Sequence, residues 1–356
     1  MEMAQNNFEK LISEQQEIEL TDSEIIGAYS VDQNGVYKND LSALKYLKKK
    51  YWNAPQDVNF DLKEIYKRME PIEKKPHDYL ERLTKLTRFI QENPKNIIKN
   101  KRVDADFVCF RGVLTNILRS FYDCLGFVLE AVKLKETIYL ALKTDKQEPP
   151  PHLTIFETCL LSTDPKDESA EIKKDEFNIV LSREINELKI LFAAECDGII
   201  SVDAIKNIHD LEQSMLIEVK AKLDIPKHSS PRYHDYNKLY TWCQSFIASI
   251  DTIYVGKRND QDIVNRIEKF DLETLEYPKY SSKFWEKNDC LNRLREFLRN
   301  IKEDMQAVDD PRKVFSYDWK ERPKKGPKNK FPIFADELDD RENLSQEYIS
   351  FINNLK

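Results

Sequence analysis

The sequence predicts an α+β fold in which helices flank mixed, twisted β-sheets. Three observations support this class. Segments with strand-like and helix-like apolar spacing alternate along the chain, and no internal repeat is found. Of the 356 residues, 40% are hydrophobic and 11% aromatic, which suffices for a substantial core. No composition change marks a second domain, so we expect a polar arm over residues 1–30 and a single domain over residues 31–356.

The individual elements follow from the period of the apolar residues, which is about two in a strand and about 3.6 in a helix. A helix is expected over residues 76–93, where Pro94 closes it. The other expected helices cover 113–123, 233–250 and 284–305, with a short one after 176–185. The expected strands cover 107–112, 136–142, 152–161, 192–200, 215–223 and 252–258. The polar segment 162–176 is expected to be an exposed loop.

The composition argues against several classes of protein. With only 7 glycines and no GxGxxG or GxxxxGK[ST] pattern, a glycine-rich phosphate loop is not expected. No apolar run approaches the roughly 20 residues of a membrane span, and the polar N-terminus is unlike a secretory signal. The net charge of −7 combines 56 basic with 63 acidic residues, so it does not decide whether one groove binds nucleic acid. The six cysteines stand singly, which favours reduced, structural thiols in an intracellular protein.

Charged residues interrupt two apolar stretches that are expected to be buried strands. The first, FAAECDGII, carries Glu195 and Asp197 on one face, and the second, MLIEVKAK, carries Glu218 and Lys220. An unpaired buried carboxylate is costly, so something must compensate these charges. Hard divalent cations prefer oxygen ligands, which makes a metal ion the leading candidate.

An acid that ends one strand, followed by E-x-K on its neighbour, is similar to the skeleton of metal-dependent nucleases of the PD-(D/E)xK type. In such a site the ions neutralise a phosphate and lower the pKa of an attacking water. Lys220 would orient that water or stabilise the charge of the transition state. For Glu218 and Lys220 alone, a simple ion pair at a strand edge is the other interpretation. The triplet also occurs at Glu187–Lys189, where it opens a strand instead of lying within one.

Three further residues extend this set. Glu157 ends the expected strand LTIFE, and Arg111 lies at a strand-to-helix junction, where it and helix N-terminal amides can meet a phosphate. Gln244 lies within the apolar helix pattern LYTWCQSFI, from which its amide can reach a phosphate oxygen. Each residue alone also has a structural interpretation.

The order of these motifs resembles the DXO family of RNA 5′-end decapping exonucleases. The matching stretches are FVCFRGVLTNIL, the LTIFE segment, ECD, EVK and WCQSF, followed by IYVGKRN, and they form a motif core over residues 107–258. The resemblance implies a PD-(D/E)xK-nuclease-like core. It also implies hydrolysis of 5′-triphosphate, incompletely methylated or NAD-type caps, with 5′→3′ degradation of the RNA in some members.

The resemblance further implies a role for each matched residue. Glu157, Asp197 and Glu218 would ligate two ions, Mg²⁺ or Mn²⁺, and the carbonyl of Val219 would contribute. Glu195 would complete the catalytic site directly or through water. Lys220 and Gln244 would position the nucleophile and the scissile phosphate, and Arg111 would hold the RNA 5′ region. Replacing Asp197 and Glu218 by Ala is expected to abolish catalysis and to leave the protein as stable or more so.

One position departs from the family pattern, because Leu153 stands where the family has a glycine four residues before the first metal-binding glutamate. A side chain there is expected to narrow the pocket for the 5′ end. This divergence keeps a second hypothesis open, in which the protein stabilises a 5′→3′ exoribonuclease or protects RNA ends. A DNA nuclease that shares only the E-x-K core is a third hypothesis.

Two expectations concern RNA contact and location. Lys222, Tyr240 and Trp242 are candidates for a groove that binds single-stranded RNA, although their interpretation as core or surface residues is stronger. The basic stretch 319–330 is either a nuclear import or nucleic-acid-binding segment or a solvated loop. Together with the resemblance, it favours a nuclear location, with the cytoplasm as a second one.

Overall fold

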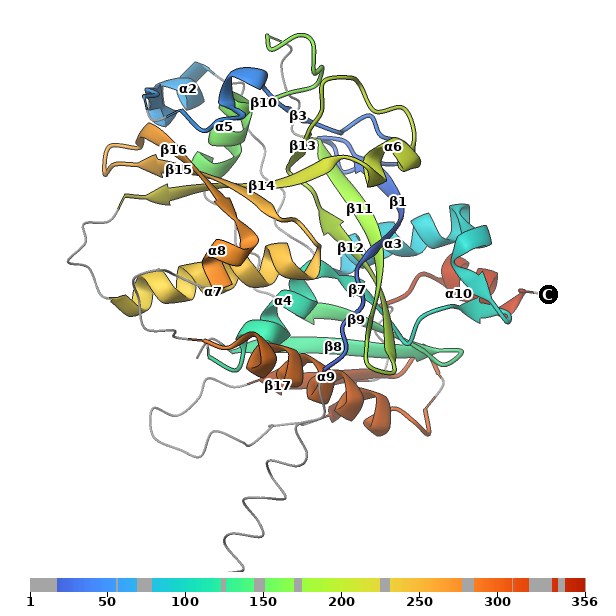
Figure 1. Ribbon diagram of the computed structural model, residues 1–356. Coiled ribbons are helices and arrows are strands. Elements are labelled where there is room, and N and C mark those ends of the chain that lie inside the picture. The colour runs from blue at the N-terminus through green and yellow to red at the C-terminus, as the bar shows by residue number, and fades with distance from the viewer. Residues whose placement is uncertain are drawn as a thin grey trace, which may run out of the picture.

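Two large sheets form the body of the protein (Figure 1). The computed structural model describes residues 18–55, 57–68, 79–122, 126–143, 151–169, 175–224, 231–276, 285–308, 310–319, 335–338 and 343–355. The nine-stranded sheet has the order β18 (Ala335–Leu338), β17 (Val314–Trp319), β8 (Phe127–Leu134), β9 (Thr137–Lys143), β7 (Phe107–Phe110), β12 (Leu188–Glu195), β11 (Glu176–Ile185), β1 (Glu24–Val31) and β2 (Tyr37–Lys38). The seven-stranded sheet has the order β10 (Leu161–Ser162), β3 (Tyr46–Leu47), β13 (Gly198–Ile200), β14 (Met215–Leu223), β15 (Thr252–Arg258), β16 (Ile263–Asp271) and β4 (Phe60–Asp61).

Both sheets are mixed, as predicted. β7 pairs in parallel with β12 and β9, and β14 pairs in parallel with β15, whereas β11 and β12 form an antiparallel pair. A separate hairpin joins β5 (Ile98–Lys99) to β6 (Arg102–Val103). In the described part of the chain, no helix is long and apolar enough to cross a membrane.

Helices cover both faces of the nine-stranded sheet, because its central strands are apolar on both faces. Along β12, Phe192 and Ala194 join the core under α4 (Arg111–Arg119), α7 (Pro231–Ile247) and α9 (Lys287–Asp304). Leu191 and Ala193 point the other way, into the core under α3 (Tyr79–Glu92) and α10 (Gln346–Asn353). The seven-stranded sheet is covered by α5 (Pro151–Leu160) and α2 (Leu62–Arg68). The remaining short helices are η1 (Lys49–Tyr51), η2 (Pro94–Asn96), α6 (Ile208–Glu212) and α8 (Leu272–Glu276).

The prediction of a single strand over FAAECDGII is wrong. The stretch belongs to two strands in different sheets. β12 ends at Glu195, where it still pairs with β11, and β13 begins at Gly198, where it pairs with β14. Between them the chain crosses from the nine-stranded to the seven-stranded sheet. The crossing is tight at Gly198, since an added Cβ would lie 3.1 Å from the carbonyl oxygen of Lys45.

The predicted strand over 152–161 is wrong, because residues 151–160 form α5. Pro151 stands at the first helical position, which proline favours, and Ile155, Phe156 and Leu160 bury one helical face. The run LTIF is rich in strand-forming residues, so packing of this face on the seven-stranded sheet overrides local preference. Glu157 therefore lies on a helix.

Two more predictions need correction near β11. The short helix expected after residues 176–185 is absent, because Asn186 and Glu187 join β11 directly to β12 in a two-residue turn in which Asn186 has a φ of 49°. The predicted arm over 1–30 is wrong for residues 24–30, which belong to β1 and pair with β11. Residues 1–17 lie outside the described part.

The other predicted elements are confirmed with small shifts of their ends. They are α3, β7, β9, β14, α7, β15 and α9, while the helix predicted over 113–123 is α4 and begins at Arg111. Residues 163–169 form turns, in agreement with the predicted loop. Of the basic stretch 319–330, only Trp319 lies within the described residues.

Candidate metal and phosphate site

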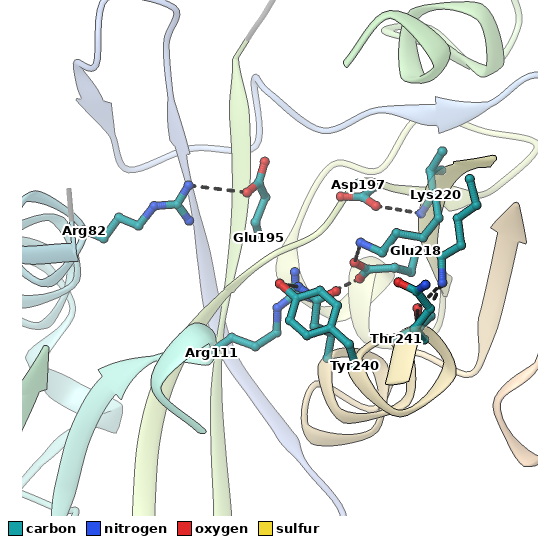
Figure 2. Close-up of polar contacts among 12 residues, drawn as sticks. Arg82, Arg111, Glu195, Asp197, Glu218, Lys220, Tyr240 and Thr241 are labelled. Atoms are coloured by element: carbon teal, nitrogen blue, oxygen red, sulfur yellow. Dashed lines mark hydrogen bonds and ion pairs between the residues drawn. The ribbon is translucent and has the colours of Figure 1, made fainter. Parts of the chain in front are cut away.

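Glu218 is the centre of the candidate site and is completely buried in β14. Arg111 reaches it from the first turn of α4, with 2.8 Å between Nη1 and Oε2. Lys220, two residues along the strand, donates to the other carboxylate oxygen (Figure 2). Burial alone would raise the pKa of Glu218, but the two cations outweigh it and lower this pKa to about 2. The predicted common face of Glu218 and Lys220 is thus confirmed.

Asp197 faces Glu218 from the crossing between the two sheets. Its Oδ2 accepts a hydrogen bond of 2.6 Å from the amide of Val219. Burial and the neighbouring charges of Glu218 and Glu195 nevertheless raise the pKa of Asp197 to about 7. Val219 contacts Asp197 through its amide, and the role predicted for its carbonyl stays a prediction.

Glu157 belongs to the same electrostatic cluster although it comes from α5. Burial raises its pKa to about 8, and the charge of Asp197 adds to this rise, whereas Lys45 and Lys220 oppose it. Among the described residues, Glu157 forms no ion pair. The negative charges of ionised Glu157 and Asp197 are therefore only partly balanced by the positive side chains of the protein.

Glu195 turns away from these acids, towards α3. Its Oε2 lies 3.6 Å from Nη2 of Arg82 (Figure 2). The same Nη2 lies 3.4 Å from Oε1 of Glu176. The guanidinium of Arg82 stacks over the ring of Phe110 at 4.5 Å. Arg82 thus holds Glu195 at the edge of the site, which the sequence did not predict. Its helix has an ordinary amphipathic pattern, and only the fold brings Arg82 to the carboxylates.

The other predicted site residues have partners within the protein. Arg111 contacts Glu218, and its contact with RNA stays a prediction. Gln244 donates a 3.1 Å hydrogen bond to the hydroxyl of Tyr240.

The three groove candidates differ in exposure. Trp242 is fully buried and stacks on Phe246, which makes it a core residue. Tyr240 is 39% exposed and lies under the guanidinium of Arg119. Lys222 donates to Thr241 at 2.7 Å, and burial together with Lys220 and Lys257 lowers its pKa to about 7. Tyr240 and Lys222 border the site, whereas Trp242 belongs to the core.

The carboxylates fit a hard divalent cation by their chemistry, although they are not arranged as a preformed site. Within the described ranges, no group of three His, Cys, Asp or Glu side chains is placed to hold a metal. The reason is visible in the contacts: Arg111 and Lys220 bind the oxygens of Glu218, and Arg82 holds Glu195. The donors are all carboxylate oxygens, and their mutual repulsion is what a divalent cation would relieve. A cation would then compete with Lys220 and Arg111 for Glu218.

The two central acids differ in their expected effect on stability. Asp197 has a raised pKa, so its removal relieves repulsion, in line with the expectation from sequence. For Glu218 the structure reverses that expectation, because its removal leaves Arg111 and Lys220 buried without a counter-charge.

The pKa shifts predict a pH dependence that a divalent metal should change. Glu157 and Asp197 hold protons in the folded protein at pH values where the unfolded chain has released them, so their contribution to stability falls as pH rises from about 4 to about 8. Glu218 acts oppositely, and its contribution is lost as pH falls from about 4.5 to about 2. Since metals bind ionised carboxylates, Mn²⁺ should raise Tm more at about pH 8 than at about pH 5. Thermal unfolding with EDTA and with Mn²⁺ tests this, and equal shifts at both pH values would contradict it.

Comparisons with known proteins identify the family of this chain. A family model described as RAI1 like PD-(D/E)XK nuclease matches residues 21–346. The Decapping and exoribonuclease protein Rai1 of Drosophila melanogaster is 24% identical over 314 residues, which cover 80% of this chain and 81% of that protein. The Decapping and exoribonuclease protein of Homo sapiens is 26% identical over 318 residues, which cover 83% of this chain and 78% of that protein.

Solved structures share the fold. The structure of Candida albicans Rai1 in complex with pU5-Mn2+ matches with a TM-score of 0.73 at 17% identity and covers 96% of this chain and 97% of that chain. That of Scheffersomyces stipitis Rai1 in complex with (3'-NADP)+ and calcium ion matches with a TM-score of 0.71 at 18% identity and covers 93% of this chain and 95% of that chain. The resemblance seen in the motifs is confirmed by the family model, which spans most of the sequence. This protein belongs to the family of RAI1-like PD-(D/E)XK nucleases.

Proposed function

We propose that this protein is a metal-dependent hydrolase of RNA 5′ ends that removes triphosphate, incompletely methylated or NAD-type caps. Degradation of the RNA in the 5′→3′ direction is a second activity within the same proposal. The main supporting observation is that four charged residues lie together where the chain crosses between the two sheets, namely Glu218, Lys220, Arg111 and Asp197. The names of the relatives, which are decapping nucleases and exoribonucleases, support the reaction class.

In this proposal the metal ligands are Glu157, Asp197 and Glu218, assisted by Glu195 and by the carbonyl of Val219. Two ions, Mg²⁺ or Mn²⁺, would supply charge neutralisation and an acidified water. The manganese in the complex of the Candida albicans relative supports the choice of a divalent ion.

Lys220 acts as a cation and not as a base in this scheme. Burial would lower its pKa, but Glu218 and Asp197 outweigh burial and raise it above its usual range. The ammonium therefore stays charged at neutral pH and can stabilise negative charge on the scissile phosphate. Gln244 would position the same phosphate once its amide turns from Tyr240 to the substrate.

The proposal is tested with internally labelled RNAs that differ only at the 5′ end. The series carries monophosphate, triphosphate, unmethylated cap, methylated cap, NAD or hydroxyl, each incubated with Mg²⁺, Mn²⁺ or EDTA. Metal-dependent release of the 5′ end, lost in Glu218→Gln but kept in Glu187→Gln, would establish the activity and its substrate. If no end is processed while RNA or a 5′→3′ exoribonuclease still binds, the stabilising or end-protecting role takes its place. Imaging of the tagged chain tests the nuclear location that we include in the proposal.

Leu153 is expected to restrict the 5′ ends that this protein accepts. It lies one helical turn before Glu157 on α5 and is only partly buried. Leu153→Gly should raise the rate on capped RNA relative to triphosphate RNA several-fold, at a cost to helix stability of about 1 kcal/mol. Leu153→Ala is the matched control, because it also shortens the side chain but keeps helix propensity. Unchanged relative rates in both variants would show that Leu153 does not limit the pocket.

A further inference from the structure

Lys45 is a buried cation beside the carboxylates. It lies directly before β3 and is only 9% exposed. A lysine this buried normally has a charged or hydrogen-bonding partner. Within the described part of the chain, its side chain makes neither a hydrogen bond nor an ion pair, so its three N–H donors are available.

The fold fixes Lys45 next to the crossing between the two sheets. Its carbonyl accepts a 2.9 Å hydrogen bond from the amide of Ile199, and the following residue, Tyr46, pairs with Ile199 in parallel register. The close approach of its backbone to Gly198 places Lys45 beside the residue that follows Asp197. The charge of Lys45 acts on Glu157 and Glu176, whose pKa values it lowers against the effect of burial. The backbone contacts with Gly198 and Ile199 therefore place Lys45 beside the acidic cluster.

The other cations of the site are bound to carboxylates. Arg111 and Lys220 both contact Glu218, and Arg82 lies between Glu176 and Glu195. Lys45 differs from all three because its donors are uncommitted among the described residues. A cation with free donors at the edge of an acidic site suits an anionic group that arrives with the substrate, and a phosphate oxygen is such an acceptor.

We propose that Lys45 binds the 5′-terminal phosphate of the RNA substrate and so sets a preference for phosphorylated 5′ ends. This inference rests on the proposed function, since it names the part of the substrate that meets this side of the site. Lys45 is a substrate-binding residue in this assignment. It neither ligates metal nor transfers a proton.

The test measures binding, so it does not depend on turnover. Oligouridylates with a 3′-fluorophore and a 5′-triphosphate, 5′-monophosphate or 5′-hydroxyl are titrated with protein in Ca²⁺, and anisotropy gives Kd. Lys45→Met should weaken binding of the phosphorylated ends about tenfold and leave the hydroxyl end unchanged. Lys45→Arg, which keeps the charge, should retain most of the preference.

Two further measurements separate substrate binding from a structural role. If Lys45 only compensates Glu157, Lys45→Met changes Mn²⁺ affinity and Tm but affects all RNA ends alike, which overturns the proposal. Equal weakening of all three ends would instead indicate contact with an internal phosphate and also overturns it. If the wild type hydrolyses 5′ ends and Lys45→Met shows no altered preference, this inference fails alone. If the wild type hydrolyses no end but prefers phosphorylated ends through Lys45, only the proposed hydrolase activity fails.

Discussion

Glu218→Gln is expected to abolish hydrolysis of RNA 5′ ends and to lower the free energy of unfolding by about 3–5 kcal/mol. Under the proposed function, activity is lost because the variant lacks the charge of a proposed metal ligand and the counter-charge of Lys220. The loss of stability follows from burial: Glu218 is completely inaccessible, and Arg111 and Lys220 are only 8% and 14% exposed. Gln keeps the shape of the side chain but leaves both cations without a counter-charge.

Urea unfolding followed by circular dichroism measures the free energy of unfolding, and single-turnover assays measure the hydrolysis of RNA 5′ ends. Glu187→Gln is the matched control, since Glu187 opens the other E-x-K triplet but is exposed in the turn between β11 and β12. The free energy of unfolding of that variant should stay within about 0.5 kcal/mol of the wild type, and its activity should be complete.

A second variant isolates the charge effect: adding Arg111→Met to Glu218→Gln should restore part of the lost stability. If the double variant is less stable than Glu218→Gln, lost packing and not unpaired charge explains the result.

The strand that carries Glu218 and Lys220 was predictable because its information is local. Residues two apart on a strand share a face, so the E-x-K triplet within an apolar run predicts both the strand and the pairing of its charges. The same reasoning located Asp197 near Glu218. It could not show that β12 ends at Glu195 and that Asp197 lies in the crossing to the other sheet, because the break depends on pairing with β11 on one side and β14 on the other.

The parts that the sequence did not predict come from distant segments. Lys45 and Arg82 precede the motif core of residues 107–258, and no spacing relates them to the carboxylates. Glu157 was found as a carboxylate that ends an apolar run, but the predicted strand was wrong, because a short apolar run with β-branched residues has the same pattern in a strand and in a buried helix. Its helix is set by packing on the seven-stranded sheet. Local pattern therefore identified most of the acids, whereas the arrangement of the cations around them required the fold.

Asp197→Asn is expected to abolish hydrolysis like Glu218→Gln but to change stability in the opposite direction. The pKa of Asp197 is raised to about 7, so above this pH the folded protein carries a charge that burial and Glu218 oppose. Asn removes the charge, and its side-chain carbonyl can still accept from the amide of Val219. Without divalent metal, the variant should be more stable than the wild type at about pH 8, with a Tm higher by roughly 2–4 °C. The gain should vanish at about pH 5, where Asp197 of the wild type is already protonated.

Thermal unfolding in EDTA at both pH values measures this difference, and Mn²⁺ titration measures the metal affinity that the variant should lose. A buried salt-bridge network would make both carboxylates stabilising, so Asp197→Asn would then destabilise the protein as Glu218→Gln does. A metal site requires acids that repel one another until a metal ion binds, together with basic side chains that hold one of the acids in place. If the site binds metal, Glu218→Gln and Asp197→Asn both lose activity, but their stability changes have opposite signs. If both variants lose stability, the metal-site interpretation of Asp197 is excluded.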